Sequence, residues 1–155
     1  MGIVRGLIVF VKGMQHFTFG RRNGFRVSEI VLGTAQFGSR WGYGADAEAI
    51  PLIFKAFADA GGTFIDTGPS YQGGESEENV GRLIAGRRDE FSIATKFSIA
   101  GPQRSGPLQT GSSRRSMMRS IEGSLHRLGT DYVDMLLGAL ARHGDPDRRN
   151  SSRHR

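Results

Sequence analysis

Short apolar runs alternate along this chain with stretches in which apolar residues recur at helical spacing. The runs predict β-strands at residues 30–32, 63–65, 91–95 and 132–137, each bounded by glycine, proline or polar residues. Apolar residues at helical spacing predict helices between consecutive strands, at residues 47–60, 76–84 and 117–128. Because strands that alternate with helices join by right-handed crossovers, this order predicts a parallel sheet of the α/β class.

Glycine and proline mark where the predicted helices begin and end. Pro51 is tolerated only within a first turn, so the first helix is expected to start close to it. Gly61 and Gly62 are expected to end that helix, and Gly129 to end the third. The apolar face of the first helix is expected to consist of Ile50, Ile53, Phe54, Phe57 and Ala58.

The two ends of the chain depart from this strand and helix alternation. Residues 16–19 alternate polar and aromatic side chains, and an Asn-Gly pair at 23–24 separates them from a second short run at 25–27, which predicts a β-hairpin. From Gly138 onward nothing is periodic, and residues 148–155 contain no apolar side chain. We therefore expect a disordered tail.

Composition narrows the class of protein. The 155 residues are 37% hydrophobic and 23% charged, as in globular proteins. The longest apolar stretch, residues 6–11, lies between Arg5 and Lys12 and is too short to span a bilayer. The absence of cysteine excludes disulfides and thiolate metal sites and agrees with a cytoplasmic location. No histidine and carboxylate pair has metal-ligand spacing, so no metal is expected.

The formal net charge of +6 raises the question of a nucleic-acid partner. Much of the excess lies in the last fourteen residues, in Arg142, Arg148, Arg149, Arg153 and Arg155. This tail has no aromatic side chain on which bases could stack. A solvated basic tail is therefore favoured over a nucleic-acid-binding module.

Polar side chains follow the first three predicted strands. Thr34, Asp66 and Lys96 lie where these strands end, and Tyr71 comes five residues after Asp66. Because parallel strands end on the same side of a sheet, these side chains are expected to converge on one mouth.

A carboxylate, a lysine and a phenol at one mouth are suited to carbonyl reduction. Hydride addition leaves a developing alkoxide that must receive a proton, and a phenol with a reference pKa of about 10 is a poor donor at neutral pH. A neighbouring ammonium favours the phenolate, and a carboxylate beside the ammonium keeps it charged and in place. The hydride must come from a nicotinamide, since no side chain supplies one.

These residues and their surroundings resemble the aldo-keto reductase superfamily over residues 14–137. The matching segments are 27–34, 60–67, Tyr71, 74–78, 93–96 and 124–134. The resemblance implies a (β/α)8 TIM barrel, of which this chain holds an N-terminal hairpin and about four β/α units. Residues 1–13 then form an N-terminal extension, residues 14–137 a partial barrel, and residues 138–155 a disordered basic tail.

The resemblance also implies roles for individual residues. Asp66, Tyr71 and Lys96 match three members of a catalytic tetrad, with Tyr71 as proton donor, Lys96 promoting its ionisation and Asp66 holding Lys96. NADPH is the implied cofactor, with Gly33, Thr34 and Asp66 expected to contact it. The implied reaction is the reduction of a small aldehyde or ketone to an alcohol.

The fourth member of the tetrad is missing from its place. In the family a histidine follows the fourth strand in a pattern like Trp-Val-His, but residues 138–141 read Gly-Ala-Leu-Ala and His143 lacks that context. A shift of the reading frame by one nucleotide permits Trp-Val-His, and residues 145–154 then permit a string that resembles the family's next helix. We infer a frameshift near Leu137, which predicts an incomplete and inactive fragment.

Two alternatives stay open on sequence grounds. The chain could be a non-catalytic binding or regulatory protein on the same scaffold, although such a protein has no need of Asp66, Tyr71 and Lys96 together. Trp41 and Tyr43 could contact a substrate, as aromatic residues of this loop do in the family, or simply cover the first strands.

Overall fold

The computed structural model describes residues 13–20, 24–97 and 113–138. Within them the strands are β1 (His16–Thr18), β2 (Arg26–Ser28), β3 (Val31–Gly33), β4 (Phe64–Asp66), β5 (Ser92–Phe97) and β6 (Met135–Gly138). The helices are α1 (Ala49–Asp59), α2 (Glu75–Ile84) and α3 (Arg114–Leu128), with short 3-10 turns η1 (Tyr71–Gly74) and η2 (Arg88–Glu90).

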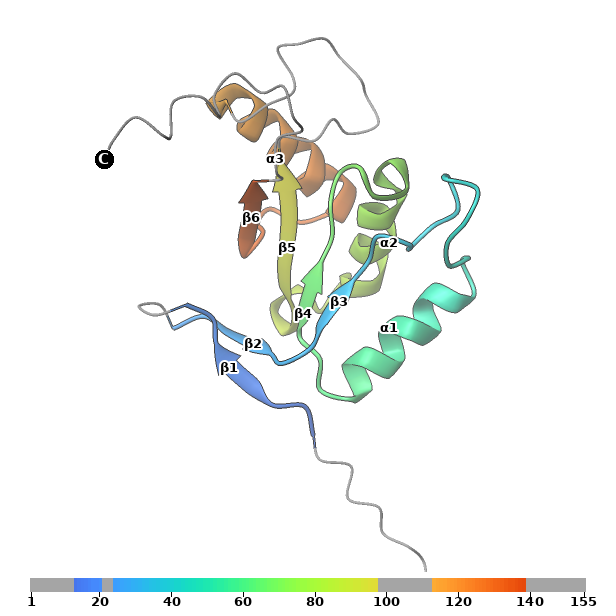
Figure 1. The fold of residues 1–155 in the computed structure, drawn as a ribbon, viewed down its shortest axis with the longest axis vertical. Helices are drawn as coiled ribbons and strands as arrows, with labels where there is room; N and C mark the ends of the chain where they lie inside the picture. The colour runs from blue at the N-terminus through green and yellow to red at the C-terminus, as the bar shows by residue number, and fades with distance from the viewer. Residues whose placement is uncertain (1–12, 21–23, 98–112, 139–155) are drawn as a thin grey trace, which may run out of the picture.

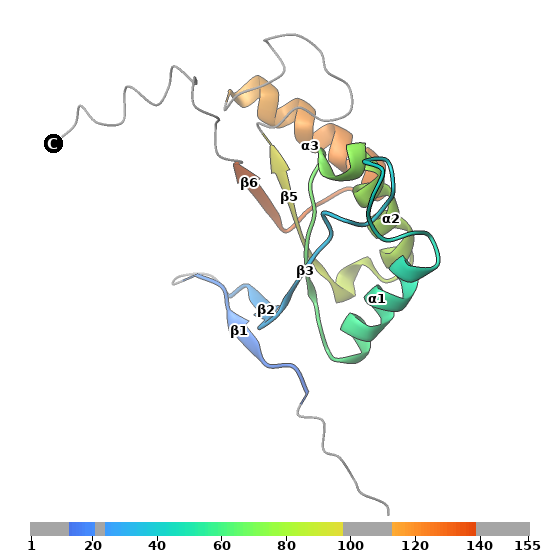
Figure 2. The ribbon, with the colours of Figure 1, turned by 45° about the vertical axis from the view of Figure 1, so that its right-hand side comes forward.

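Four strands form one parallel sheet in the order β3-β4-β5-β6 (Figure 1). A helix follows each of the first three strands, and all three helices lie on the same side of the sheet (Figure 2). β1 and β2 pair antiparallel as a hairpin at the foot of the sheet. The parallel β/α units and the hairpin confirm the predicted fold class. The structure forms only part of a complete (β/α)8 barrel.

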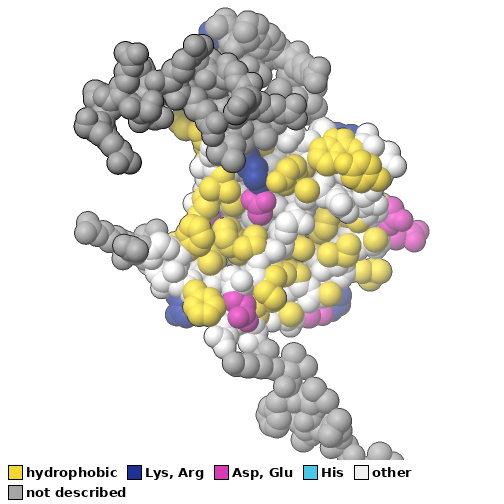
Figure 3. Space-filling view, in the orientation of Figure 1, with side chains coloured by type: hydrophobic (Ala, Val, Ile, Leu, Met, Phe, Trp, Pro, Cys, Tyr) yellow, Lys and Arg dark blue, Asp and Glu magenta, His cyan; other side chains and the backbone are white. Residues whose placement is uncertain are grey.

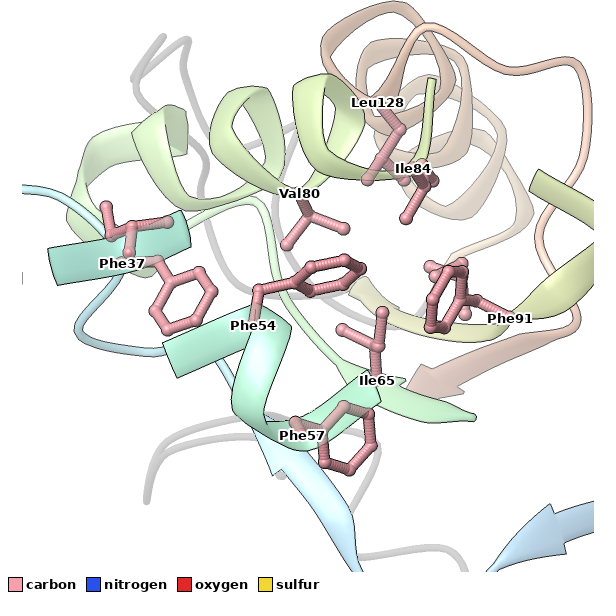
Figure 4. Packing of buried hydrophobic residues seen from close by; sticks show 10 residues of the cluster. Phe37, Phe54, Phe57, Ile65, Val80, Ile84, Phe91 and Leu128 are labelled. Carbon is pink, nitrogen blue, oxygen red and sulfur yellow. The ribbon is translucent and has the colours of Figure 1, made fainter. Parts of the chain in front are cut away.

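The main hydrophobic core fills the space between the sheet and the helices. Phe54 of α1 contacts Phe91 with ring centroids 5.1 Å apart, and Val80 and Ile84 of α2 pack beside them (Figure 4). Ile65, at the centre of the sheet, is fully buried here. Burying one such side chain stabilises the fold by about 2 kcal/mol, so this cluster fixes the helices on the strands.

A second apolar cluster lies on the opposite face of the sheet, under the hairpin. Phe64 of β4 packs edge to face against Phe19 and Phe25, with ring centroids 6.0 and 6.2 Å away. Val27 and Ala94 complete the buried part of this cluster. The hairpin thus covers the beginning of the strands on the side that carries no helix.

The structure corrects details of the predicted elements. Ile53 was expected on the buried face of the first helix but is 41% exposed, because Ile50, Phe54 and Phe57 define that face and Ile53 lies at its edge. The last strand starts at Met135 rather than Tyr132. Before it, Tyr132 donates a hydrogen bond to Asp89, and this bond raises the pKa of the Tyr132 phenol.

Several predictions fall on segments that the structure does not describe. They concern the extension at residues 1–12, the turn at Asn23 and the tail at 139–155, including His143 and nearly all of the inferred frameshift region. In the part of the chain that is described, no helix is long and apolar enough to cross a membrane.

Candidate active site

Asp66 and Lys96 form an ion pair at the carboxyl end of the sheet. Asp66 ends β4 and Lys96 lies near the end of β5, both on the face that carries no helix. Lys96 Nζ lies 2.6 Å from Asp66 Oδ1 and 2.7 Å from Oδ2, and it also donates to the Thr67 carbonyl at 2.9 Å. The two side chains are 27% and 18% exposed, so the pair is partly shielded yet open to a ligand.

Tyr71 lies beside this pair, at the start of η1. Lys96 Nζ is 4.7 Å from the centroid of the Tyr71 ring. Among the described residues, none forms a hydrogen bond with the Tyr71 hydroxyl. Gly68 lies between the two side chains, and a Cβ there would lie 3.5 Å from Lys96 and 3.7 Å from Tyr71. The three predicted residues therefore come together.

A cluster of buried hydroxyls supports Asp66 from behind. Ser76 Oγ donates to the Thr34 carbonyl at 2.7 Å and lies 3.2 Å from Thr67 Oγ1. Thr34 in turn donates its amide and its hydroxyl to the Asp66 carbonyl, each at 3.0 Å. All three hydroxyl residues are fully buried. They fix the main chain that carries Asp66.

The three residues predicted to contact the cofactor have different surroundings. Gly33 is exposed, and a Cβ built on it would meet nothing within 4 Å, which leaves room for a flat ring against the backbone. Asp66, which pairs with Gly33 across β3 and β4, is partly exposed. Thr34 is fully buried with its polar atoms bonded inside the protein. The cofactor role of these residues stays a prediction.

Two further polar residues near the site were not singled out from the sequence. Glu77 is fully buried and accepts hydrogen bonds from Thr95 at 2.6 Å and Arg127 at 2.7 Å, which ties α2 to β5 and α3. Gln72, the neighbour of Tyr71, is also fully buried. The sequence did not reveal these two residues, because burial depends on neighbours that are distant along the chain.

No metal centre accompanies the site in the described ranges. Within residues 13–20, 24–97 and 113–138, no group of three or more histidine, aspartate or glutamate side chains could hold a metal ion. The ion pair and the phenol lie together at the carboxyl ends of parallel strands. The fold has the arrangement of part of a β/α barrel, with these polar side chains at the carboxyl ends of its strands.

Comparison with known proteins identifies the family. The family model for the aldo/keto reductase family matches residues 29–143. A norsolorinic acid reductase of Emericella nidulans is 39% identical in an alignment of 122 positions that covers 73% of this chain and 32% of that protein. An aryl-alcohol dehydrogenase [NADP(+)] of Phanerodontia chrysosporium is 38% identical in an alignment of 125 positions that covers 72% of this chain and 32% of that protein.

A solved structure agrees with this assignment. A putative aldo-keto reductase from Pseudomonas aeruginosa has a TM-score of 0.67 and 30% sequence identity, covering 85% of this chain and 50% of that one. The chain belongs to the aldo/keto reductase family. It spans about a third of the length of the curated relatives and half of that solved structure.

Proposed function

We propose that this chain carries the proton-donating part of an NADPH-dependent carbonyl reductase. The observation that carries the proposal is the contact of Lys96 Nζ with both Asp66 oxygens while it lies 4.7 Å from the Tyr71 ring centroid. This arrangement places one charged donor between a carboxylate and a phenol at the mouth of parallel strands, where β/α barrels have their active sites.

The proposed reaction divides its work among these residues. When bound, NADPH supplies the hydride that adds to the carbonyl carbon. The Tyr71 hydroxyl gives its proton to the carbonyl oxygen, and the resulting phenolate later recovers a proton from solvent. The Lys96 ammonium attracts the negative charge that develops on the phenol oxygen, and Asp66 keeps the ammonium in place.

Aromatic aldehydes and ketones are the proposed substrates. The relatives named norsolorinic acid reductase and aryl-alcohol dehydrogenase support this class. Trp41 and Tyr43, on the loop that follows β3, also support it, since these residues are 42% and 60% exposed and their rings could stack on a flat substrate. A cysteine-free chain that needs NADPH fits the cytoplasm.

A chimeric protein that joins this chain to the second half of a related barrel tests this function. This chain covers half of the Pseudomonas aeruginosa protein. We define the completed barrel as residues 14–137 of this chain joined to the other half of that protein. With deuterated NADPH and an aromatic aldehyde, we expect the deuterium to appear on the alcohol carbon. A folded completed barrel that oxidises no NADPH with any aromatic carbonyl compound would overturn the proposal.

The 155 residues alone are proposed to give no turnover, because they correspond to half of the solved barrel. The same assay on the chain by itself is the measurement. Oxidation of NADPH that depends on added aldehyde would contradict this part of the proposal. It would leave the role of Tyr71 intact.

A further inference from the structure

The loop between β3 and α1, residues 34–48, is held by side chains of η1 and α2. Asn79 donates to the Phe37 carbonyl at 3.2 Å, and one oxygen of Glu75 accepts from the amides of Ser39 and Arg40 at 3.0 and 3.1 Å. Gln72 holds the next part of this loop. The turn η1, which begins with Tyr71, leads directly into α2, and side chains of both elements bind the loop.

Gln72 binds the loop backbone with both ends of its amide. Its Oε1 accepts from the Trp41 amide at 2.9 Å, and its Nε2 donates to the Tyr43 carbonyl at 3.0 Å. These bonds need a donor and an acceptor on one planar group, which neither a carboxylate nor an ammonium provides. Gln72 is fully buried, so these bonds are shielded from competing water.

The backbone of Gln72 adopts a conformation that most residues avoid. Its φ of 49° lies in the left-handed region and is the only positive φ of a non-glycine residue in the described part of the chain. Glycine would adopt this conformation at lower cost. A glutamine in this place indicates that its side chain has a role that outweighs the backbone cost.

The loop is fitted closely against Gln72. A Cβ on Gly44 would lie 2.9 Å from Gln72 Nε2 and 2.0 Å from the Gly38 carbonyl oxygen. No larger residue fits there without moving the loop. On the outer side, the rings of Trp41 and Tyr43 lie 5.9 Å apart and are exposed. We call these two side chains the aromatic pair.

We propose that Gln72 is a positioning residue that fixes the aromatic pair relative to Tyr71, its neighbour in the chain. This inference rests on the proposed function. If that function holds, Gln72 determines the orientation in which an aromatic carbonyl compound approaches the Tyr71 hydroxyl. The amide of Gln72 acts through the loop and does not touch the substrate.

The first test uses the 155-residue chain and its single tryptophan, Trp41. Gln72→Gly removes the amide and relieves the backbone, whereas Gln72→Met keeps the volume and removes only the hydrogen bonds. Loss of two hydrogen bonds should raise the population of detached loop by about thirtyfold. Both variants should therefore lower the fluorescence anisotropy of Trp41 and increase its quenching by acrylamide, with an unchanged circular dichroism spectrum.

Two further variants control this test. Gln36→Ala changes an exposed glutamine of the same loop and should leave Trp41 as in the wild type. Gly44→Ala distorts the loop itself, because a Cβ there would lie 2.0 Å from the Gly38 carbonyl oxygen, and should mobilise Trp41 although Gln72 is retained. Anisotropy and quenching of Trp41 that are equal in the wild type, Gln72→Gly and Gln72→Met would overturn the proposal.

The second test measures the effect on the reaction in the completed barrel. Gln72→Gly should raise the KM for an aromatic aldehyde by up to about thirtyfold and change kcat less, because the pair is displaced while Tyr71 is retained. An unchanged KM with a mobile Trp41 would overturn the proposed role. If the unmodified completed barrel is inactive, the proposed function fails, and Trp41 in the chain still decides whether Gln72 holds the loop.

Discussion

Lys96 has two different kinds of partner, and they contribute differently to its position. The Asp66 carboxylate accepts two hydrogen bonds from the ammonium between opposite charges, whereas the Thr67 carbonyl, an uncharged acceptor, accepts one at 2.9 Å. Because Thr67 is itself fixed in the buried hydroxyl cluster, the ammonium keeps one rigid contact even without the carboxylate. The site should therefore tolerate loss of Asp66 better than loss of Lys96.

Substitution of the two ion-pair residues in the completed barrel tests this order. Lys96→Met removes the charge beside Tyr71 and should lower kcat/KM on the order of 100-fold. Asp66→Asn leaves Lys96 bonded to Thr67 and should lower kcat/KM only about tenfold. Steady-state kinetics with an aromatic aldehyde measures both values, and a larger loss in Asp66→Asn would show that the carboxylate has the more direct role.

At the scale of elements, Glu77 joins three parts of the fold that carry the site. It lies in α2, bonds Thr95 of β5 next to Lys96, and pairs with Arg127 of α3. A fully buried carboxylate is costly unless it is paired and hydrogen-bonded, and both conditions hold here. Removing one partner leaves the other uncompensated.

Glu77→Gln should therefore destabilise the chain by about 3 kcal/mol, because the Arg127 guanidinium loses its counter-charge. The free energy of unfolding in urea measures this effect. Glu90→Gln provides the matched control, since the Glu90–Arg87 pair is exposed and should contribute less than about 1 kcal/mol. Equal effects of the two substitutions would mean that Glu77 is not a structural link between these elements.

The elements could be predicted from sequence because their signals are local. Short apolar runs indicated the strands, apolar residues at helical spacing indicated the helices, and Gly129, which ends α3 with a φ of 63°, marked a boundary. Asp66, Lys96 and Tyr71 were found because each lies at a recognisable place after a strand. Glu77 and Gln72 were not found, since the partners of Glu77 lie 18 and 50 residues away and those of Gln72 lie 29 and 31 residues away.

At the scale of the whole molecule, the sheet presents unpaired edges and an apolar face. In the described residues β3 pairs only with β4, and β6 only with β5. Figure 3 shows apolar side chains spread over the face seen in Figure 1. Val31 of the β3 edge is 43% exposed. Exposed apolar edge strands favour association with other chains.

The 155-residue chain is accordingly expected to self-associate through these edges. Val31→Lys places a charge on the β3 edge and should reduce light scattering at a given protein concentration. Leu52→Lys is the control, because Leu52 is 69% exposed on α1 and lies outside the sheet. Equal reductions by both variants would indicate a general solubility effect instead of edge pairing.

Single-turnover hydride transfer in the completed barrel tests whether Tyr71 donates the proton during carbonyl reduction. Tyr71→Phe removes only the hydroxyl oxygen and keeps the ring near Lys96. We expect the rate of hydride transfer to an aromatic aldehyde to fall by about 100-fold or more, while the Kd for NADPH stays unchanged. A Tyr71→Phe variant that transfers hydride at the unmodified rate would contradict this expectation.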